Sequence, residues 1–392
     1  MSVSTAVPAN DSLAGASVAI YMHDLSGGGV ERQSLVLAEE FRRSGIEVTL
    51  VLHRRRGELT DELPAGLRVV DLNSSRTLGD IPRLMKFLRA ERPHFLLSNL
   101  DMNNVAALLA KGLAFSGTRV VICQHNPLSS SFVASENWMY RFVAPGYRAL
   151  RPLISGAVAV SRGVAEELRA MCGLPPERVV TINNPVIGPD FHARSRERIE
   201  HPWFDAADRR PVFVTAGRLV VHKDHKTLLR ALALHRRHSD SRLIILGTGP
   251  LEGSLRVLAD TLGVAEAVDF AGFRPNVLPY CREAQAFVLS SRCEGFGNVI
   301  VEAMGCGTPV ISTRCEHGPA EILAGGRYGV LVDPRNPAAL AEAMDGVATL
   351  HERFPAELLR RRAADFSYEA CAARYLAFFN TLSPYRAVVA SS

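Results

Sequence analysis

A chain of 392 residues, 47% of them hydrophobic, is long enough for two or three globular domains with buried cores. Its 45 basic and 40 acidic residues leave a formal charge of +5, a balance too even to support a nucleic-acid-binding module. The seven cysteines form no C-x-x-C pair and no zinc-ligand spacing, so we expect reduced thiols and no metal site.

The N-terminus predicts a flexible tail over residues 1–16, because it lacks the basic start and the continuous apolar run of a signal peptide. No uninterrupted apolar stretch is long enough to cross a bilayer. We therefore expect a cytoplasmic protein, with any membrane contact confined to the inner surface of a membrane.

The first domain opens with a strand, a glycine loop and a helix. Residues 18–22 are apolar, Gly27, Gly28 and Gly29 follow, and residues 30–45 have an amphipathic pattern. Backbone without side chains can approach a ligand closely, and a helix N-terminus favours anions. A tight turn that serves packing alone is the alternative, because the dinucleotide motif G-x-G-x-x-G is absent in its usual form.

Strands and helices then alternate, which predicts a parallel sheet with helices on both faces. His125 ends one of these strands, so its side chain is expected where ligands bind in such sheets; a structural histidine that caps a loop is the alternative. The expected strands are 46–52, 67–73, 94–100, 119–125 and 156–161, and the expected helices are 81–91, 103–114 and 164–173.

Two basic segments have more than one interpretation. Residues 53–56, HRRR, predict a solvated loop. Residues 138–154 mix aromatic residues with arginines, which suits a membrane surface, a lipid acceptor or ordinary core packing. Pro145 and Gly146 predict a break in any helix there.

Residues 188–210 predict a linker, because they are rich in charge and interrupted by Pro and Gly. A second alternation follows and predicts a second doubly wound domain, so the crevice between the two domains is the natural ligand site. Its expected strands are 211–219, 241–249, 268–273, 284–291, 309–313 and 329–334, with helices from about residues 224 and 251.

Cations follow the first strand of this second domain. Arg218 and Lys223 can neutralise a diphosphate, the first as a planar fork and the second as a point charge; ordinary surface charge is the alternative. The turn that ends at Gly249 is expected to shape a nucleotide pocket, and Arg274, at another strand exit, to approach the base.

Residues 290–311 combine two acids, a glycine turn and a helix start. Glu294 leaves a buried strand, Gly295 and Gly297 permit a sharp turn, and Glu302 lies on the helix that begins near Asn298. Carboxylates accept hydrogen bonds from sugar and ribose hydroxyls, and the helix N-terminus binds phosphate, so the stretch suits a sugar nucleotide. A helix cap and a solvated acid are the structural alternatives.

Five segments together resemble glycosyltransferase family 4, retaining enzymes of GT-B fold. They are GGGVE at 27–31, QHN at 124–126, AVSRGVAEEL at 159–168, GRLVVHKD at 217–224 and EGFGNVIVEAMGCGTPVI at 294–311. The resemblance implies an α/β fold of two doubly wound Rossmann-like domains that face each other across a cleft. The acceptor-side domain would span 17–187, the nucleotide-sugar domain 211–368, and a closing helix that returns to the first domain, with the tail, 369–392.

The resemblance also implies roles for these residues. Arg218 and Lys223 would carry the donor diphosphate, Glu302 the ribose hydroxyls, and Glu294 the transferred sugar. His125 would lie near the donor sugar. Gly28 and Gly29 would lie by the phosphates, and the sugar-facing turn would consist of Phe296, Gly297, Asn298 and Val299.

The implied activity is retaining transfer of a hexose or N-acetylhexosamine from a nucleotide sugar to a glycan or lipid-linked acceptor. UDP is the expected nucleotide, with GDP and ADP open, and the cations predict metal-independent chemistry without a cofactor. A non-catalytic sugar-nucleotide-binding module and a dinucleotide-dependent oxidoreductase are the alternatives. His317 and Pro319 depart from the loop of many relatives, which leaves the choice of sugar open.

Overall fold

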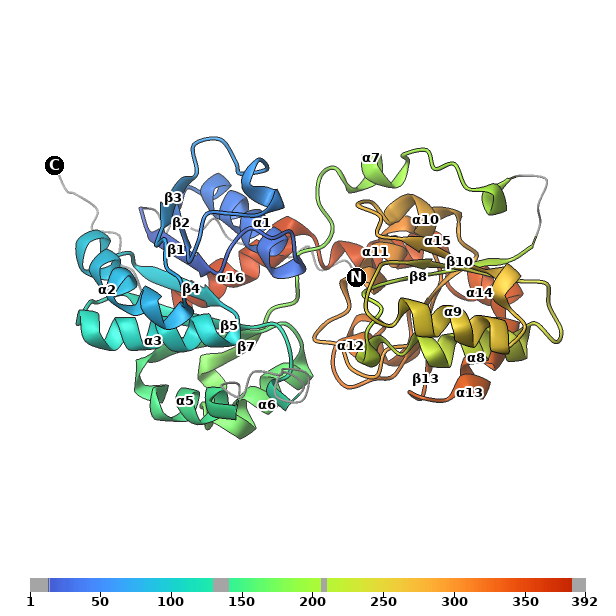
Figure 1. Ribbon diagram of the computed structural model, residues 1–392. Coiled ribbons are helices and arrows are strands. Elements are labelled where there is room, and N and C mark those ends of the chain that lie inside the picture. The colour runs from blue at the N-terminus through green and yellow to red at the C-terminus, as the bar shows by residue number, and fades with distance from the viewer. Residues whose placement is uncertain (1–12, 14, 130–140, 206–209, 383–392) are drawn as a thin grey trace, which may run out of the picture. The chain divides into compact units, whose positions relative to one another are not determined.

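The computed structural model describes residues 13, 15–129, 141–205 and 210–382. They fall into two compact units, the first formed by the chain up to Pro185 together with the segment from Tyr368, and the second by Val186–Ser367 (Figure 1). Most of the predicted N-terminal tail and all of 383–392 lie outside the described residues.

The first unit is built on a seven-stranded parallel sheet of order β3-β2-β1-β4-β5-β6-β7. The doubly wound order expected from the alternation is therefore present. The strands are β1 (Ser17–Met22), β2 (Glu47–Leu52), β3 (Arg68–Asp71), β4 (Phe95–Asn99), β5 (Arg119–Gln124), β6 (Ile154–Ala159) and β7 (Val179–Thr181). The helices are α1 (Gly29–Arg43), α2 (Asp80–Glu91), α3 (Asp101–Ala114), α5 (Val143–Ala149), α6 (Arg162–Cys172) and α16 (Tyr368–Leu382).

Helix α16, the last described element, packs against α1 in the core of the first unit. Phe379 stacks on Phe95 of β4 with ring centroids 4.5 Å apart and contacts Phe41 of α1 at 5.8 Å. Aromatic pairs of this kind add about 0.5–1.5 kcal/mol beyond the burial of their area. The apolar stripe of α16 is therefore core, and it ties the end of the chain to the first unit.

Helix boundaries follow local sequence signals. Helix α6 begins after Ser161, whose hydroxyl accepts from the Val164 amide at 3.4 Å, and ends at Gly173 in a left-handed conformation. The predicted break at Pro145 and Gly146 is wrong, because α5 runs through both. Proline is tolerated in the first turn of a helix, where its missing amide has no partner to lose.

The second unit has a six-stranded parallel sheet of order β10-β9-β8-β11-β12-β13. Its strands are β8 (Val212–Ala216), β9 (Arg242–Leu246), β10 (Val268–Gly272), β11 (Ala286–Leu289), β12 (Val310–Thr313) and β13 (Val330–Val332). Its helices are α7 (Phe191–Ser195), α8 (His225–His235), α9 (Glu252–Thr261), α10 (Leu278–Glu283), α11 (Asn298–Cys306), α12 (Pro319–Ile322), α13 (Pro337–Asp345), α14 (Val347–Arg353) and α15 (Ala356–Ala364).

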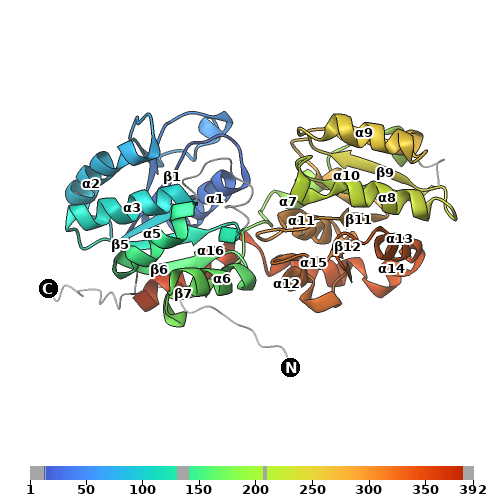
Figure 2. The ribbon, with the colours of Figure 1, turned by 60° about the horizontal axis from the view of Figure 1, so that its bottom comes forward.

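Helices cover both faces of this sheet. Helices α8, α9 and α13 pack together on one face, while α7, α10, α11 and α15 pack together on the other (Figure 1; Figure 2 gives a second view of the same helices). Residues 188–210, which the composition predicts as a linker, contribute α7 and the short helix Pro202–Phe204, and the described part of this segment belongs to the second unit. The β strands are buried along most of their length, as expected for a parallel sheet covered on both sides.

Candidate active site

The strand order reverses between β8 and β11, which lie side by side at the centre of the second sheet. In sheets of this kind ligands bind beyond the carboxyl ends of the strands at such a point. The loop after β8 carries Arg218 and Lys223, and the loop after β11 carries Glu294. The topology therefore gathers three of the predicted site residues at one edge of one sheet.

Lys223 and Glu294 are in direct contact. Lys223 Nζ lies 2.6 Å from Glu294 Oε1, and the Ser291 hydroxyl donates to the same oxygen at 2.6 Å. The side chains of the lysine and the glutamate are only 19% and 9% exposed. A charged pair with so little solvent around it interacts more strongly than a surface pair, because water screens it less.

Asp224 and Arg292 fix the two loops to each other. The Arg292 guanidinium donates to both carboxylate oxygens of the buried Asp224, at 2.8 and 2.9 Å. The Arg292 amide also donates to the carbonyl of His222, and Ser290 Oγ donates to the carbonyl of Lys223. These bonds hold the backbone of Lys223 against the strand exit that carries Glu294.

Sequence reasoning missed this clamp. Asp224 directly follows Lys223, and Arg292 lies two residues before Glu294, but charged residues at those places are common in loops. One signal is visible only in the backbone: Asp224 has φ of 48°, a left-handed conformation that aspartate adopts more readily than most residues.

Arg218 is exposed, and its side chain makes no hydrogen bond or ion pair with a residue that the structure describes. Gly249, in the turn after β9, lies against the backbone of Leu219, the residue that follows Arg218. A Cβ at Gly249 would lie 2.6 Å from the Leu219 carbonyl oxygen, so no larger residue fits without movement. The predicted turn at Gly249 thus lies against the loop that carries Arg218, whose exposed guanidinium can reach a ligand.

The glycine turn leads into α11 as expected. Gly297 is the N-cap of that helix with φ of 106°, a conformation that favours glycine. Phe296 is 3% exposed and packs edge-on against Phe366 with centroids 5.4 Å apart. Phe296 is thus an anchor that holds the turn, while Asn298 and Val299 are half-buried in the first turn of α11.

Glu302 lies in the middle of α11, and its carboxyl group has a raised pKa. Protein surrounds its carboxyl group although some solvent access remains, and burial raises the pKa of Glu302 to about 6, with the charge of Arg194 acting in the opposite direction. A carboxylate that lacks full hydration is a good acceptor for the hydroxyl groups of a ligand. Perturbed acids of this kind are common at functional sites.

Arg274 is less closely associated with these residues. It follows β10, which β9 separates from β8, and its Nε donates to the Tyr280 hydroxyl at 3.1 Å. No described contact joins it to Arg218, Lys223 or Glu294. Its predicted role at the base stays a prediction.

The first unit has its own reversal, between β1 and β4, with Gly28 and Gly29 after the first strand and Asn99 at the end of the second. His125, after β5, places Nε2 2.9 Å from Asn99 Oδ1. Its Nδ1 is buried and has no hydrogen-bond partner among the described residues. Burial lowers the pKa of His125 to about 4, so the imidazole is neutral near pH 7.

Gly28 and Gly29 form the N-terminus of α1 in that unit. Gly28 is the N-cap and has no side chain to occupy the first amides of the helix, which begins at Gly29. Asn99 also approaches α1, because its Nδ2 lies 3.4 Å from Ser34 Oγ. Sequence reasoning did not select Asn99, whose position at the end of a strand is the only signal for it.

A second polar cluster in the first unit was also missed. Tyr21 donates to Asp80 Oδ2 at 2.5 Å, and His53 Nδ1 lies 2.9 Å from both oxygens of that carboxylate. His23 stacks on His53 with centroids 4.4 Å apart. The solvated loop expected at 53–56 is therefore wrong for His53, which is 3% exposed, because Asp80 gives the imidazole a buried partner.

Two further expectations concern membranes and metals. No helix in the described ranges is long and apolar enough to cross a membrane. The described part of 138–154 borders a hollow of about 490 Å³ lined by Ala144, Pro145, Arg148, Ala149 and Met171. Within the same described ranges, no three His, Cys, Asp or Glu side chains gather as metal ligands would.

Comparison with protein families matches both units. Residues 27–187 match the model described as "Glycosyltransferase Family 4", and residues 210–349 match "Glycosyl transferases group 1". Together these matches cover most of the chain. The chain belongs to glycosyltransferase family 4. The resemblance drawn from the five sequence segments is therefore confirmed.

Curated relatives of this family 4 chain match it in part. The lipopolysaccharide core biosynthesis glycosyltransferase LpsE of Rhizobium meliloti is 34% identical over 181 residues, 45% of this chain and 52% of the relative. The GDP-mannose-dependent alpha-(1-6)-phosphatidylinositol monomannoside mannosyltransferase of Mycolicibacterium smegmatis is 38% identical over 167 residues, 40% of this chain and 42% of the relative. The matches thus span about half the length of these relatives.

Solved structures establish the fold of the family 4 chain. A glycosyltransferase from Rickettsia africae superposes with a TM-score of 0.77 at 17% identity, over 94% of this chain and 98% of the other. Anabaena HepE in complex with UDP gives 0.76 at 18% identity, over 93% and 100%. The fold is GT-B, with two Rossmann-like parallel-sheet units, as the sequence predicts.

Proposed function

We propose that this protein is a retaining glycosyltransferase that moves a hexose or N-acetylhexosamine from a nucleotide sugar to a glycan or lipid-linked acceptor. The observation that carries the proposal is the pairing of Lys223 with Glu294 at the reversal point of the second sheet, in a chain of glycosyltransferase family 4. A cation suited to phosphate and an acid suited to hydroxyls thus lie in contact.

The donor diphosphate is assigned to Arg218 and Lys223. As the bond from the anomeric carbon to the phosphate oxygen breaks, negative charge grows on the departing diphosphate, and fixed cations stabilise it. Ser290 fixes the backbone of Lys223 through its carbonyl, and the ammonium group contacts Glu294, a contact that the diphosphate would share or displace. Arg218 is exposed and can turn its guanidinium toward the same group.

The two carboxylates are assigned to hydroxyl groups. Glu302 accepts from the ribose hydroxyls, while Glu294 orients the transferred sugar, and Ser291 holds one of its oxygens. We assign the acceptor proton to the departing phosphate on the same face of the sugar, which gives retention without a protein nucleophile. In the first unit, the neutral His125 and the amides near Gly28 and Gly29 are assigned to the donor sugar and its phosphates.

UDP is the proposed nucleotide, with GDP and ADP as alternatives. HepE was solved with UDP and with UDP-glucose, which supports UDP, whereas the mycobacterial relative is named GDP-mannose-dependent. A lipid-linked or glycan acceptor fits relatives named for lipopolysaccharide core and for a diphospho-undecaprenol acceptor. We place the reaction at the cytoplasmic face of a membrane, with peripheral contact only.

Metal independence is part of the proposal. Lys223, Arg218 and the N-terminus of α11 can supply the positive charge that a divalent cation supplies to diphosphates in other enzymes. Transfer is expected to persist after dialysis against a chelator. Loss of transfer that added Mg²⁺ or Mn²⁺ restores would reject this part alone.

Product analysis tests the proposal. The purified chain is incubated with UDP-, GDP- and ADP-sugars and a panel of glycan and lipid-linked acceptors, and products are identified by mass spectrometry and by the NMR coupling of the anomeric proton. A product whose anomeric configuration matches the donor supports it. Donor binding without transfer or hydrolysis across the panel would favour the non-catalytic sugar-nucleotide-binding module. The match to glycosyltransferase models argues against the alternative of a dinucleotide-dependent oxidoreductase.

A further inference from the structure

A cationic pocket lies in the second unit at the C-terminal end of α11. Its volume is about 210 Å³ and its walls are His192, Ser195, Arg196, Arg282, Gly305, Cys306 and Arg360. None of these residues belongs to the candidate donor site. Helix α11 has its first turn by the donor loop and its last turn in this pocket, about 13 Å along the axis at 1.5 Å per residue.

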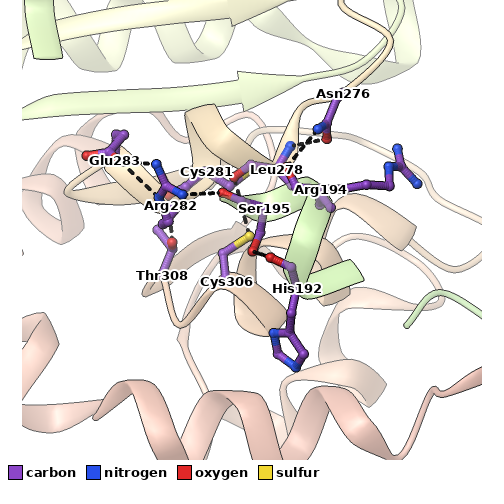
Figure 3. Close-up of polar contacts among 10 residues, drawn as sticks. All are labelled: His192, Arg194, Ser195, Asn276, Leu278, Cys281, Arg282, Glu283, Cys306 and Thr308. Carbon is purple, nitrogen blue, oxygen red and sulfur yellow. Dashed lines mark hydrogen bonds and ion pairs between the residues drawn. The ribbon is translucent and has the colours of Figure 1, made fainter. Parts of the chain in front are cut away.

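The walls of the pocket are fastened to one another, as Figure 3 shows. Arg282 Nη1 donates to the carbonyl of Ser195 at 2.6 Å, and Asn276 Nδ2 donates to the carbonyl of Arg194 at 2.8 Å. Phe191 packs so closely on α11 that a Cβ at Gly305 would lie 2.6 Å from its ring. Helix α7 is therefore attached to α10 and α11, and the pocket is a fixed feature.

The pocket concentrates positive charge. Three arginines and a histidine line it, and no carboxylate does. Glu283 accepts two hydrogen bonds from Arg282 and offsets that charge. The guanidinium of Arg196 is exposed and makes no hydrogen bond or ion pair with any residue that the structure describes, and the ring nitrogens of His192 have no polar partner there either.

Stabilisation of the helix end explains only part of this arrangement. Cations favour a helix C-terminus, and Arg360 Nη2 donates to the Cys306 carbonyl at 3.1 Å, as expected for such a role. That role leaves Arg196 and His192 unexplained, because neither reaches a carbonyl of α11. Arg196, whose guanidinium has no described partner, and Arg360, whose described partner is a backbone carbonyl, remain around one small concave space.

We propose that this pocket binds a phosphate group. Guanidinium groups match phosphate oxygens through paired hydrogen bonds, and the His192 imidazole supplies one further donor. The group can arrive as inorganic phosphate, as a small phosphomonoester or as a lipid headgroup that ends in a phosphomonoester, such as phosphatidic acid, and all three present a terminal tetrahedral phosphate. The site is separate from the donor diphosphate site and does not depend on the proposed transferase activity.

The test measures phosphate binding while the donor site is occupied. The full chain is saturated with UDP, inorganic phosphate is titrated, and binding is followed by ³¹P NMR line broadening and by isothermal calorimetry. If UDP itself fails to bind, the Arg218→Ala/Lys223→Ala variant replaces the saturated protein, so failure of the donor assignment stays distinguishable. Saturable binding in either background is the expected result.

Variants locate the binding. Arg196→Ala and Arg360→Gln are each expected to weaken phosphate binding by about tenfold or more, a loss of about 1.4 kcal/mol. Arg237→Ala removes another exposed arginine that has no described side-chain partner, and it should leave binding unchanged. Absence of saturable binding, or equal weakening by Arg237→Ala, overturns the proposal.

Two further probes identify the source of the phosphate. Glycerol 3-phosphate and vesicles of phosphatidylcholine with or without phosphatidic acid are compared with inorganic phosphate in the wild type and in Arg196→Ala. Competition by soluble phosphate against phosphatidic acid vesicles, lost in the variant, supports a shared site. Vesicle binding that survives Arg196→Ala and Arg360→Gln contradicts a headgroup role for the pocket.

Discussion

Lys223 and Glu294 are 71 residues apart in the chain, yet the ammonium and carboxylate groups lie 2.6 Å apart because their loops leave adjacent strands. A donor diphosphate must share Lys223 with this carboxylate or displace it. The pair is therefore expected to change its contacts when donor binds, and the two residues should act as one unit.

Substitutions at Lys223, Arg218 and Glu294 should affect catalysis and UDP affinity to different degrees. Lys223→Ala and Arg218→Ala remove charge that stabilises the leaving group, so kcat should fall about 10²- to 10³-fold with the fold intact. Glu294→Gln should reduce transfer more than UDP affinity, because the acid is assigned to the sugar. Steady-state kinetics and calorimetry with UDP measure both quantities.

Lys226→Ala is the matched control, because Lys226 is an exposed lysine of α8 three residues farther on. The double variant Lys223→Ala/Glu294→Gln should lose less than the two single losses combined, since each residue is the other's partner. Additive losses, or wild-type kinetics in both Arg218→Ala and Lys223→Ala, would contradict the assignment.

The Asp224–Arg292 clamp should control position rather than chemistry. Asp224→Asn keeps a residue that tolerates the left-handed backbone but weakens the bidentate ion pair, so the free energy of unfolding should fall by about 1–3 kcal/mol. The lower end is expected because the Arg292 side chain is 33% exposed. Lys223 would lose its fixed place, so kcat should fall as well.

Arg292→Lys separates charge from geometry in this clamp. It keeps the cation but not the paired hydrogen bonds. We therefore expect Arg292→Lys to lower the free energy of unfolding less than Asp224→Asn does, but to lower kcat by a similar factor. Asp260→Asn, at an exposed aspartate of α9, is the control. Full activity in both Asp224→Asn and Arg292→Lys would show that the clamp does not position Lys223.

Much of this architecture could be predicted from the sequence, and the limits have physical causes. Alternating apolar strands and amphipathic helices predict two parallel sheets, and strand exits select Arg218, Lys223 and Glu294. Which exits meet depends on the strand order, which puts β8 beside β11 and is not written in any local pattern. The contact of Lys223 with Glu294 thus required the structure.

Buried polar partners were the least predictable feature. Asp80 is 59 residues from Tyr21 and 27 from His53, and nothing in the local pattern connects them. The same applies to Asp224 and Arg292, separated by 68 residues. Proline in α5 shows the opposite error, in which a local rule was applied too strictly to a helix start that tolerates it.

Donor affinity should depend on pH through Glu302. Its pKa of about 6 lies above the ordinary value of 4.5, so the folded protein binds this proton more tightly than the unfolded chain does. The associated stabilisation is present below 4.5 and is lost as the pH rises through about 6. Only the ionised carboxylate accepts from both ribose hydroxyls, so UDP affinity should increase as the pH rises through about 6.

The measurement compares wild type with Glu302→Gln across this range. Because UDP itself titrates near pH 6, the informative quantity is the ratio of the two affinities at each pH, which cancels the ligand's own titration. The ratio should rise with pH and level off about one unit above the pKa. A ratio that stays at one across the range would remove Glu302 from the ribose, while a ratio that stays constant above one would indicate a structural role.

The Tyr21–Asp80–His53 cluster should contribute to the stability of the first unit. The Tyr21 hydroxyl is fully buried and donates to a buried carboxylate at 2.5 Å, and burial and that acid together raise the pKa of Tyr21. Tyr21→Phe removes a hydrogen bond to a charged group, so the free energy of unfolding should fall by about 1.5–3 kcal/mol. Tyr375→Phe is the control, because among the described residues its buried hydroxyl has the Cys123 thiol as its one hydrogen-bond partner, at 3.6 Å. Urea unfolding of both variants compares the two. Equal midpoints would show that the Tyr21–Asp80 hydrogen bond does not stabilise the folded state more than the Tyr375 contact does.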